Sequence, residues 1–377
     1  MSLKTLKKKK KLKKKNNFSF QYLKSQIPVI SKGIWDFFIE RNQIIISSSL
    51  KYKNILMKNF GFLILAITAL FSCDKNNDYD SNLANSSVVD VYVTGKYNNN
   101  PCYWKNTQLV LLDNGGLTNG VAQKIMVSGL DVYVLGQGTG YLNTLYWKNG
   151  ILIDLNSLLN PNNEPFLQIN DMFVEGNDVY FCGSIGNYTT KEVCFWKNGV
   201  KTTLSHNDNG SANSIVVSNN DIYVTAQSSL GRGYFKNGIF NDETYYCGIY
   251  GLSKINNDVY LYGTKDSSLT GSNYQGYYKN LTTDIATYLS NVEYVRNLNG
   301  YNNNIYFNDS LNFYTNNNPA SFFYNGMGII DFKIVNNNSY IISIEDSSIV
   351  NFYLDINNTN SIQISGADGE FTSILVI

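Results

Sequence analysis

Two short motifs recur in a fixed order through most of the chain after residue 89, and this repeat limits the fold more than any other feature. The first motif joins a polar residue, an aliphatic residue and tyrosine, at Asp90–Val93, Asp131–Val134, Asp178–Phe181, Asp221–Val224 and Asp258–Leu261, with weaker copies at Asn304–Phe307 and Ser339–Ile342. The second is aromatic and ends in Lys-Asn or Asn-Gly, at Tyr103–Asn106, Tyr146–Gly150, Phe195–Gly199, Tyr234–Gly238 and Tyr277–Asn280, with weaker copies at Phe323–Gly326 and Phe352–Tyr353. The tyrosines of the first motif lie 41, 47, 43, 37, 46 and 34 residues apart. A period of roughly 40–45 residues with several short apolar runs is typical of β-propeller blades.

Each repeat predicts four strands, here called A to D. Strand A is an apolar run such as Ser214–Val217, strand B is the first motif, strand C is the second, and strand D follows it, as in Ile151–Leu155. The Asn-Gly pair after strand C favours a type I′ turn, because both of its central residues need positive φ angles. The sequence therefore predicts an all-β fold of antiparallel hairpins.

Seven copies of the first motif predict a seven-bladed β-propeller of four-stranded antiparallel blades. The B strand at Asp90 has no adequate A strand before it, whereas residues 370–377 match the A pattern of residues 212–217. We expect the C-terminal strand to complete the first blade and close the ring, which would also remove an exposed sheet edge.

The residues before the repeat read as a targeting segment. Residues 1–56 carry 14 basic and 2 acidic side chains, and Met57-Lys58-Asn59 then precedes the apolar run Phe60–Leu70. That run is too short to span a membrane and has the length of a signal-peptide core. We expect a signal peptide at 57–72, a flexible Asn/Asp/Ser-rich tether at 73–88 and the propeller at 89–377. Residues 1–56 are either an over-extended start or a long basic leader.

The sequence Leu70-Phe71-Ser72-Cys73 resembles the bacterial lipobox, with Leu at −3, a small residue at −1 and Cys at +1. The resemblance implies cleavage before Cys73 and acylation of Cys73, which would anchor the protein to the bacterial cell envelope, with the outer membrane as the expected site. With its repeats, the chain resembles propeller-repeat lipoproteins of Bacteroidota, whose units also carry Asp-Val-Tyr-Val and Tyr-Trp-Lys-Asn-Gly. The resemblance covers residues 88–377 and the lipobox and implies almost nothing about the ligand.

The charge of the mature part limits its partners. Residues 74–377 carry 15 basic and 27 acidic side chains, a net charge of −12. A uniformly basic nucleic-acid binder is excluded, because such binding needs an excess of Lys and Arg. The expected partner is neutral or cationic.

The candidates for chemistry are few. His206 is the only histidine and is expected in a solvated loop, and zinc or iron sites need several His or Cys ligands, so we predict neither metal nor cofactor. We expect the Asp208-Asn209-Gly210 group to form a turn rather than a calcium loop. The repeated Asp of strand B should bond backbone N–H groups at a turn. The repeated Trp104, Trp147 and Trp196 should pack between blades.

The cysteines after Cys73 are Cys102, Cys182, Cys194 and Cys247. Cys182 and Cys194 lie on adjacent antiparallel strands of one unit. Because export permits disulfides, the sequence leaves two alternatives for this pair: a cross-strand disulfide or two buried free thiols.

Connectivity predicts where a ligand binds. The A–B and C–D turns should lie on one face and the longer, variable B–C and D–A connections on the other, and variable loops on a rigid scaffold are the usual place for recognition. The predicted exposed contributors are Tyr188, Arg232, Asp266, Tyr274 and Tyr314. We expect a non-catalytic binding or scaffold module for a protein or glycan. The alternatives are a polysaccharide-acting hydrolase or lyase using carboxylates, and a structural subunit of an outer-membrane complex.

Overall fold

The computed structural model describes residues 89–140, 143–243, 248–266, 274–319, 327–345, 351–356 and 360–377. The chain divides into two compact units, Met1–Ser86 and Ser87–Ile377, and only the second contains described residues. The leader, the signal peptide, Cys73, the tether and Cys247 therefore lie outside the described residues. Among the residues that are described, no helix has the length and apolar composition needed to cross a membrane.

The described residues form seven four-stranded sheets, each with antiparallel neighbours, which confirms the prediction of a β-propeller with four-stranded antiparallel blades. We number the sheets as blades along the chain. Blade 1 has the order β28 (Gly369–Val376), β1 (Val91–Tyr97), β2 (Asn100–Lys105) and β3 (Gln108–Leu111). Blade 2 has β4 (Gly120–Ser128), β5 (Asp131–Gly138), β6 (Thr144–Lys148) and β7 (Ile151–Ile153). Blade 3 has β8 (Phe166–Glu175), β9 (Asp178–Gly186), β10 (Lys191–Lys197) and β11 (Val200–Asp208).

The remaining four blades follow the same order. Blade 4 has β12 (Ser211–Ser218), β13 (Asp221–Ser228), β14 (Gly231–Lys236) and β15 (Ile239–Asp242). Blade 5 has β16 (Gly248–Ile255), β17 (Asp258–Asp266), β18 (Tyr274–Asn280) and β19 (Ile285–Tyr288). Blade 6 has β20 (Asn297–Tyr301), β21 (Asn304–Asn308), β22 (Phe313–Thr315) and β23 (Asn318–Pro319). Blade 7 has β24 (Met327–Val335), β25 (Asn338–Glu345), β26 (Asn351–Ile356) and β27 (Asn360–Ser365).

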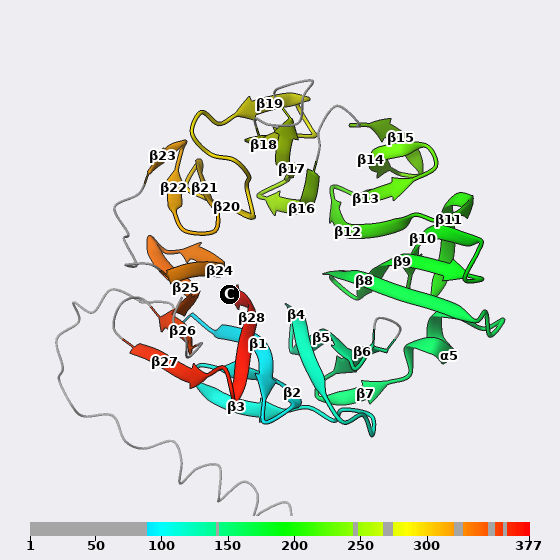
Figure 1. Ribbon diagram of the computed structural model, residues 1–377, viewed down its shortest axis with the longest axis horizontal. Coiled ribbons are helices and arrows are strands. Elements are labelled where there is room, and N and C mark those ends of the chain that lie inside the picture. The colour runs from blue at the N-terminus through cyan, green and yellow to red at the C-terminus, as the bar shows by residue number, and fades with distance from the viewer. Residues whose placement is uncertain are drawn as a thin grey trace, which may run out of the picture. The chain divides into compact units, whose positions relative to one another are not determined.

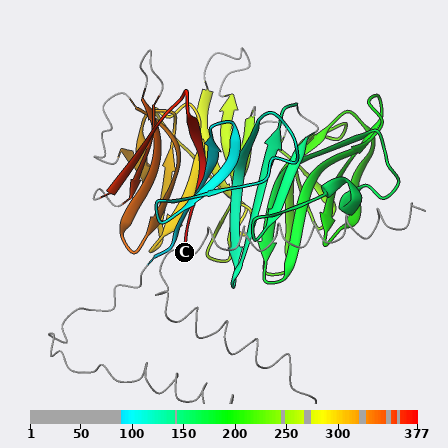
Figure 2. The same ribbon diagram turned by 90° about the horizontal axis from the view of Figure 1, so that it is seen from below.

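The first strand in each of these orders lies nearest the centre of the unit (Figure 1), and the strands run between two opposite faces (Figure 2). One face carries the A–B and C–D turns and is called here the turn face. The other carries the B–C and D–A connections and is called the loop face. This division follows from the antiparallel order of every blade.

Asn-Gly turns close the C–D hairpins as the sequence predicts. The φ angles are +52° and +76° at Asn149 and Gly150, and +50° and +84° at Asn198 and Gly199. Two successive left-handed residues define a type I′ turn, whose twist matches that of the flanking strands. Asparagine adopts this conformation more readily than most residues, which explains its frequency at these corners.

Large side chains fill the spaces between blades. Trp147 and Trp196 are fully buried. The indole N–H of Trp147 donates to the Asp113 carbonyl at 2.8 Å, and that of Trp196 donates to the Leu159 carbonyl at 3.0 Å. Each acceptor precedes the blade that holds the tryptophan, so the predicted packing role of these two residues is confirmed. Trp104 is buried edge-on against Phe371, with 4.8 Å between ring centroids.

Hydrogen bonds also join the inner strands of neighbouring blades. The Asp171 carboxylate of blade 3 accepts from the Ile215 N–H of blade 4 at 3.0 Å. The Asp331 carboxylate of blade 7 accepts from the Ile374 N–H of β28 at the same distance. Equivalent contacts cross the other junctions, at Thr372–Ala122, Lys124–Asp171, Leu252–Ser214, Ser253–Leu298 and Asn297–Ile330.

Two local predictions were wrong. The expected strand Ile151–Leu155 stops at Ile153, because Asp154 caps the short helix α5 (Leu155–Leu159) by accepting from the N–H groups of Asn156 and Ser157. His206 lies within strand β11 rather than in a loop.

Candidate functional site

The repeated Asp of strand B forms a small polar network on the turn face. In blade 2, the Asp131 carboxylate accepts from the Lys148 ammonium at 2.8 Å and from the Asn149 carboxamide at 2.8 Å. The carboxamide oxygen of Asn149 accepts from the Val132 N–H at 2.8 Å. The Lys148 ammonium also lies 5.1 Å from the centre of the Tyr133 ring. The network therefore fixes the C–D turn against strand B.

The same network recurs in other blades, which supports a structural role for the two repeat motifs. Its members are Asp90, Lys105 and Asn106 in blade 1, Asp178, Lys197 and Asn198 in blade 3, and Asp221, Lys236 and Asn237 in blade 4. In blade 6 only the asparagine of the network is present: Asn316 donates to the Asn304 side chain and accepts from the Ile305 N–H. In blade 5 the Lys279 ammonium pairs instead with the buried Glu243 at 2.7 Å and with Asp284 at 2.8 Å.

These networks predict a loss of stability in acid. The hydrogen bond from the lysine ammonium, followed by that from the asparagine, lowers the pKa of each of four aspartates below its usual value of 3.8, namely Asp90, Asp131, Asp178 and Asp221. Because the folded-state pKa is depressed, the stabilisation is complete above the unfolded-state pKa and is lost as the pH falls through the folded-state pKa. The urea concentration at the unfolding midpoint should therefore decrease as the pH is lowered below about 4. A variant with all four aspartates changed to Asn should show a shallower fall, and parallel curves would contradict the assignment.

The histidine and the described acidic residues do not gather into a metal site. His206 is exposed, and its Nδ1 lies 3.1 Å from a Glu192 carboxylate oxygen. Among the described residues, no group of three or more His, Cys, Asp or Glu side chains could hold a metal ion. Asp208 forms the expected turn, because its carboxylate accepts from the Gly210 N–H at 2.9 Å and from the Ser229 N–H at 2.6 Å.

The cysteine pair is resolved by strand register. Cys182 lies opposite Phe195, and Cys194 lies opposite Gly183. Side chains alternate between the faces of a strand, so this offset of one residue sends the two thiols to opposite faces of blade 3. Cys182 packs with Phe195 and Ile215, whereas Cys194 packs with Phe181 and Trp196. Both are buried free thiols, as is Cys102, and the disulfide alternative was wrong.

Four of the five predicted surface residues lie at the loop face. Tyr188 is in the turn between β9 and β10 and is 66% exposed, and Tyr274 begins β18 and is 53% exposed. Asp266 ends β17, where its backbone pairs with that of Tyr274. Arg232 is half-buried near the start of β14.

The prediction for Tyr314 was wrong. It lies in β22 and is buried, with its ring stacked on Phe307 at 4.8 Å between centroids and 11° between planes. Its hydroxyl donates to the Asp309 carboxylate at 2.9 Å. The segment around it reads as a polar loop because strands β22 and β23 are only three and two residues long.

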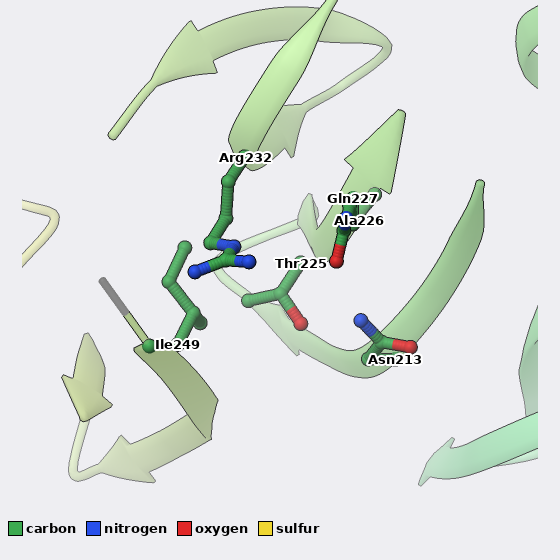
Figure 3. Close-up of a pocket in the computed structure, with 7 residues that line it drawn as sticks. Asn213, Thr225, Ala226, Gln227, Arg232 and Ile249 are labelled. Atoms are coloured by element: carbon green, nitrogen blue, oxygen red, sulfur yellow. The ribbon is translucent and has the colours of Figure 1, made fainter. Parts of the chain in front are cut away.

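Arg232 lines a cavity of about 230 Å³ between blades 4 and 5 (Figure 3). The other lining residues are Asn213, Thr225, Ala226, Gln227, Gly248 and Ile249. They come from the loop-face ends of β12, β13, β14 and β16. The Arg232 guanidinium has no hydrogen-bond or ion-pair partner among the described residues. A half-buried cation in a polar recess can accept an anionic group from a ligand, because guanidinium presents a planar fork of donors.

Thr225 adds a second unmatched polar group to this cavity. Its side chain is 2% exposed, and its hydroxyl oxygen has no hydrogen-bond partner in the structure. A buried hydroxyl without a partner costs about 1–3 kcal/mol. Buried hydroxyls are rarely left unsatisfied, and an ordered water or ion at the site is one explanation for such a group.

Replacing this hydroxyl by a methyl group should therefore stabilise the protein measured without added ligand. We expect Thr225→Val to raise the free energy of unfolding by about 1 kcal/mol in urea titrations. Thr94 is the matched control, because it has the same repeat position in blade 1 but its hydroxyl bonds to Thr372 at 3.0 Å. Thr94→Val should lower stability by a similar amount. A loss of stability in both variants would show that the Thr225 hydroxyl is already satisfied.

Two further cavities open on the same face. One, of about 590 Å³, is lined by Gln227, Asn213 and the segments 207–211 and 228–229, and so shares two residues with the Arg232 cavity. The other, of about 580 Å³, lies beside α5, and its lining includes the leucines Leu117, Leu145, Leu152, Leu155 and Leu167. Sequence reasoning found Arg232 but missed Asn213, Thr225 and Gln227. Their types and spacing carry no signal, since strand ends from two blades must meet before they form a site.

Comparison with known proteins adds little to this geometry. No family model matches the chain, and no curated protein matches it. Among solved structures, it is similar to a dihydro-heme d1 dehydrogenase, with 7% identity, 81% of this chain and 78% of that chain covered, and a TM-score of 0.43. It is also similar to a putative 6-phosphogluconolactonase from Bacteroides fragilis (10% identity, 78% and 100% covered, TM-score 0.42). An acylaminoacyl peptidase from Pyrococcus horikoshii is a third (11% identity, 74% and 51% covered, TM-score 0.43). Likeness at this level carries no inference about function.

Proposed function

We propose that this protein is a lipid-anchored lipoprotein of the bacterial envelope, whose propeller is a non-catalytic binding or scaffold module for a protein or glycan. Cys73 would carry the acyl chains and hold the protein at the outer membrane. The observation that carries the binding role is the Arg232 cavity on the loop face, where neither the guanidinium nor the buried Thr225 hydroxyl has a partner among the described residues. Cavities and variable connections meet on that face, whereas the turn face is occupied by repeated internal networks.

We also propose that the seven sheets act as one closed ring with β28 as the closing strand. Two observations support this. Strand β28 pairs with β1 from Val91 to Tyr97, although the two strands lie at opposite ends of the propeller sequence. Its Ser373 and Ile374 also donate hydrogen bonds to Asp331 of blade 7, so β28 contacts β1 on one side and blade 7 on the other. A closed ring holds its loops at fixed distances, which lowers the entropy lost when a ligand binds.

Two carboxylates of the inner strands, Asp171 and Asp331, support binding rather than hydrolysis. Asp171 accepts from Lys124, Ser214 and two backbone N–H groups. Asp331 accepts from Ser373 and two backbone N–H groups. Both are committed to joining blades, so neither is available as a general acid or base without breaking a junction.

Capture of envelope components tests the binding role. Full-length protein in detergent micelles would be immobilised through a tag after Ile377, whose side chain is half exposed, and incubated with envelope extract. Wild type should retain a protein or glycan that Arg232→Gln fails to retain. Lys148→Gln removes one positive charge from the turn face and should retain it normally. Equal retention by all three proteins, or an increase in reducing ends on incubation with retained glycan, would contradict non-catalytic binding through the loop face.

A further inference from the structure

The Arg232 cavity is a local exception to the charge of the whole body. Residues 74–377 carry a net charge of −12 and only two arginines, Arg232 and Arg296. Nine lysines of the described part form ion pairs with carboxylates, so most of the positive charge is used internally. Arg232 forms no ion pair among the described residues and lines a cavity. The net charge predicts a neutral or cationic partner, but short-range recognition at this cavity favours a single negative group.

The lining of the cavity specifies more than charge. Beside Arg232 stand the carboxamides of Asn213 and Gln227 and the unpartnered hydroxyl of Thr225. These groups both donate and accept hydrogen bonds, as the hydroxyls of a sugar require. Ile249 and Ala226 are the only apolar side chains in the lining, whereas the core of a protein–protein interface is rich in apolar and aromatic residues. The cavity volume of about 230 Å³ suits a single sugar unit of a ligand rather than a folded surface.

Two features beside the Arg232 cavity extend the candidate site, namely a second polar cavity and an exposed tyrosine. The neighbouring cavity of about 590 Å³ shares Asn213 and Gln227 and is lined by polar side chains and glycine. Its one carboxylate, Asp208, would repel a second negative charge, so neutral hydroxyl-bearing units fit there. Beside the lining residue Gly248, Tyr250 is 52% exposed, and its ring lies 3.5 Å from the position that a Cβ on Gly248 would take. Its exposed face can stack against a sugar ring, since tyrosine combines an apolar face with a polar edge.

From this arrangement we propose that the loop face binds an acidic glycan, with the carboxylate of one uronate residue on Arg232 and neutral sugar residues in the adjoining polar cavity. The Thr225 hydroxyl and the two carboxamides bind hydroxyls of the uronate, and Tyr250 stacks on a sugar ring at the rim. Binding is non-catalytic. This inference deepens the proposed function by naming the class of ligand.

The test is isothermal titration of full-length protein in detergent micelles. The probes are glucuronosyl-xylotetraose and galacturonosyl-rhamnose, each as the free acid and as its methyl ester, which removes the charge and keeps the sugar. We expect at least one free acid to bind and its ester to bind at least about tenfold more weakly, since a charge-assisted bond is worth more than a tenfold change in affinity. Arg232→Gln should cause a similar loss for the free acid and little change for the ester. Arg296→Gln, which removes an exposed arginine just before β20, should bind as wild type.

Further variants separate ligand contact from folding. Thr225→Val and Tyr250→Ala should each lower the affinity for the free acid severalfold. The urea midpoint of Thr225→Val should be equal to or above that of wild type. Failure of both free acids to bind, or equal affinity of acid and ester, would overturn the uronate assignment. If envelope capture still depends on Arg232 in that case, the proposed binding role stands and only the glycan class is wrong.

Discussion

A protein that ends at Gly369 should lose its cooperative unfolding transition. Removing residues 370–377 takes away most of β28 and with it the buried side chains of Phe371, Ile374 and Val376. Each contributes about 1.5–3 kcal/mol through burial, against a total stability of about 5–15 kcal/mol for a typical domain. The truncation also exposes the edge of β1 and leaves the Asp331 carboxylate without Ser373 and Ile374. The expected product is an aggregation-prone chain rather than a slightly weaker propeller.

Circular dichroism during urea unfolding is the measurement for this truncation. Phe371→Ala is the graded control, because it removes one large side chain, keeps the strand and should cost about 3–5 kcal/mol. It should therefore unfold cooperatively at a lower urea midpoint. If the truncated protein keeps both the midpoint and the slope of the full chain, β28 is not the closing strand and the inner-strand hydrogen bonds at the junction of blades 7 and 1 contribute little.

The second large effect concerns the anchor. Cys73→Ser should move the protein from the membrane pellet to the soluble fraction and abolish its labelling by an alkyne fatty acid. Each buried methylene of an acyl chain contributes about 0.8 kcal/mol, so the several chains expected on one cysteine hold the protein firmly at the membrane. The variant without acyl chains would lack this anchor. Ser72→Ala, which keeps a small residue before the cleavage position, should behave as wild type. Continued labelling and pelleting of Cys73→Ser would show that the lipobox resemblance is accidental.

The repeat predicted the strands well because each motif combines an apolar run with a corner of known chemistry. Asn149-Gly150 and Asn198-Gly199 fix both the position and the type of a turn, and a fixed turn sets the register of the strands on each side. The structural role of the repeated Asp was predicted, but its partners were not: Asp131 bonds the side chains of Lys148 and Asn149. The backbone N–H group, that of Val132, donates to Asn149 instead. Strand positions and turn types within a hairpin were therefore accessible from the sequence, but side-chain partners were not.

Features that depend on the exact strand register or on contacts between two blades could not be predicted from the sequence. The disulfide alternative for Cys182 and Cys194 fails by a single residue of offset, and the assignment of strands alone does not fix that offset. Tyr314 was placed in a loop because its strand is too short to show alternation. The Arg232 cavity needs Asn213 from one strand and Ile249 from the next blade, and their sequence spacing does not encode their approach. Arg232 was predicted only as an exposed residue of the variable loop face, because it follows strand B of its repeat.

Hydrogen–deuterium exchange of the full-length protein, with and without the envelope material that wild type retains, tests most directly whether the loop face is the recognition surface. We expect added protection in segments 207–213, 226–232 and 248–250, which line or border the Arg232 cavity and its neighbour. We expect no change at the C–D turns around Asn106, Asn149 and Asn198, whose networks are internal to each blade. Protection confined to those turns, with the loop-face segments unchanged, would show that the loop face is not the recognition surface.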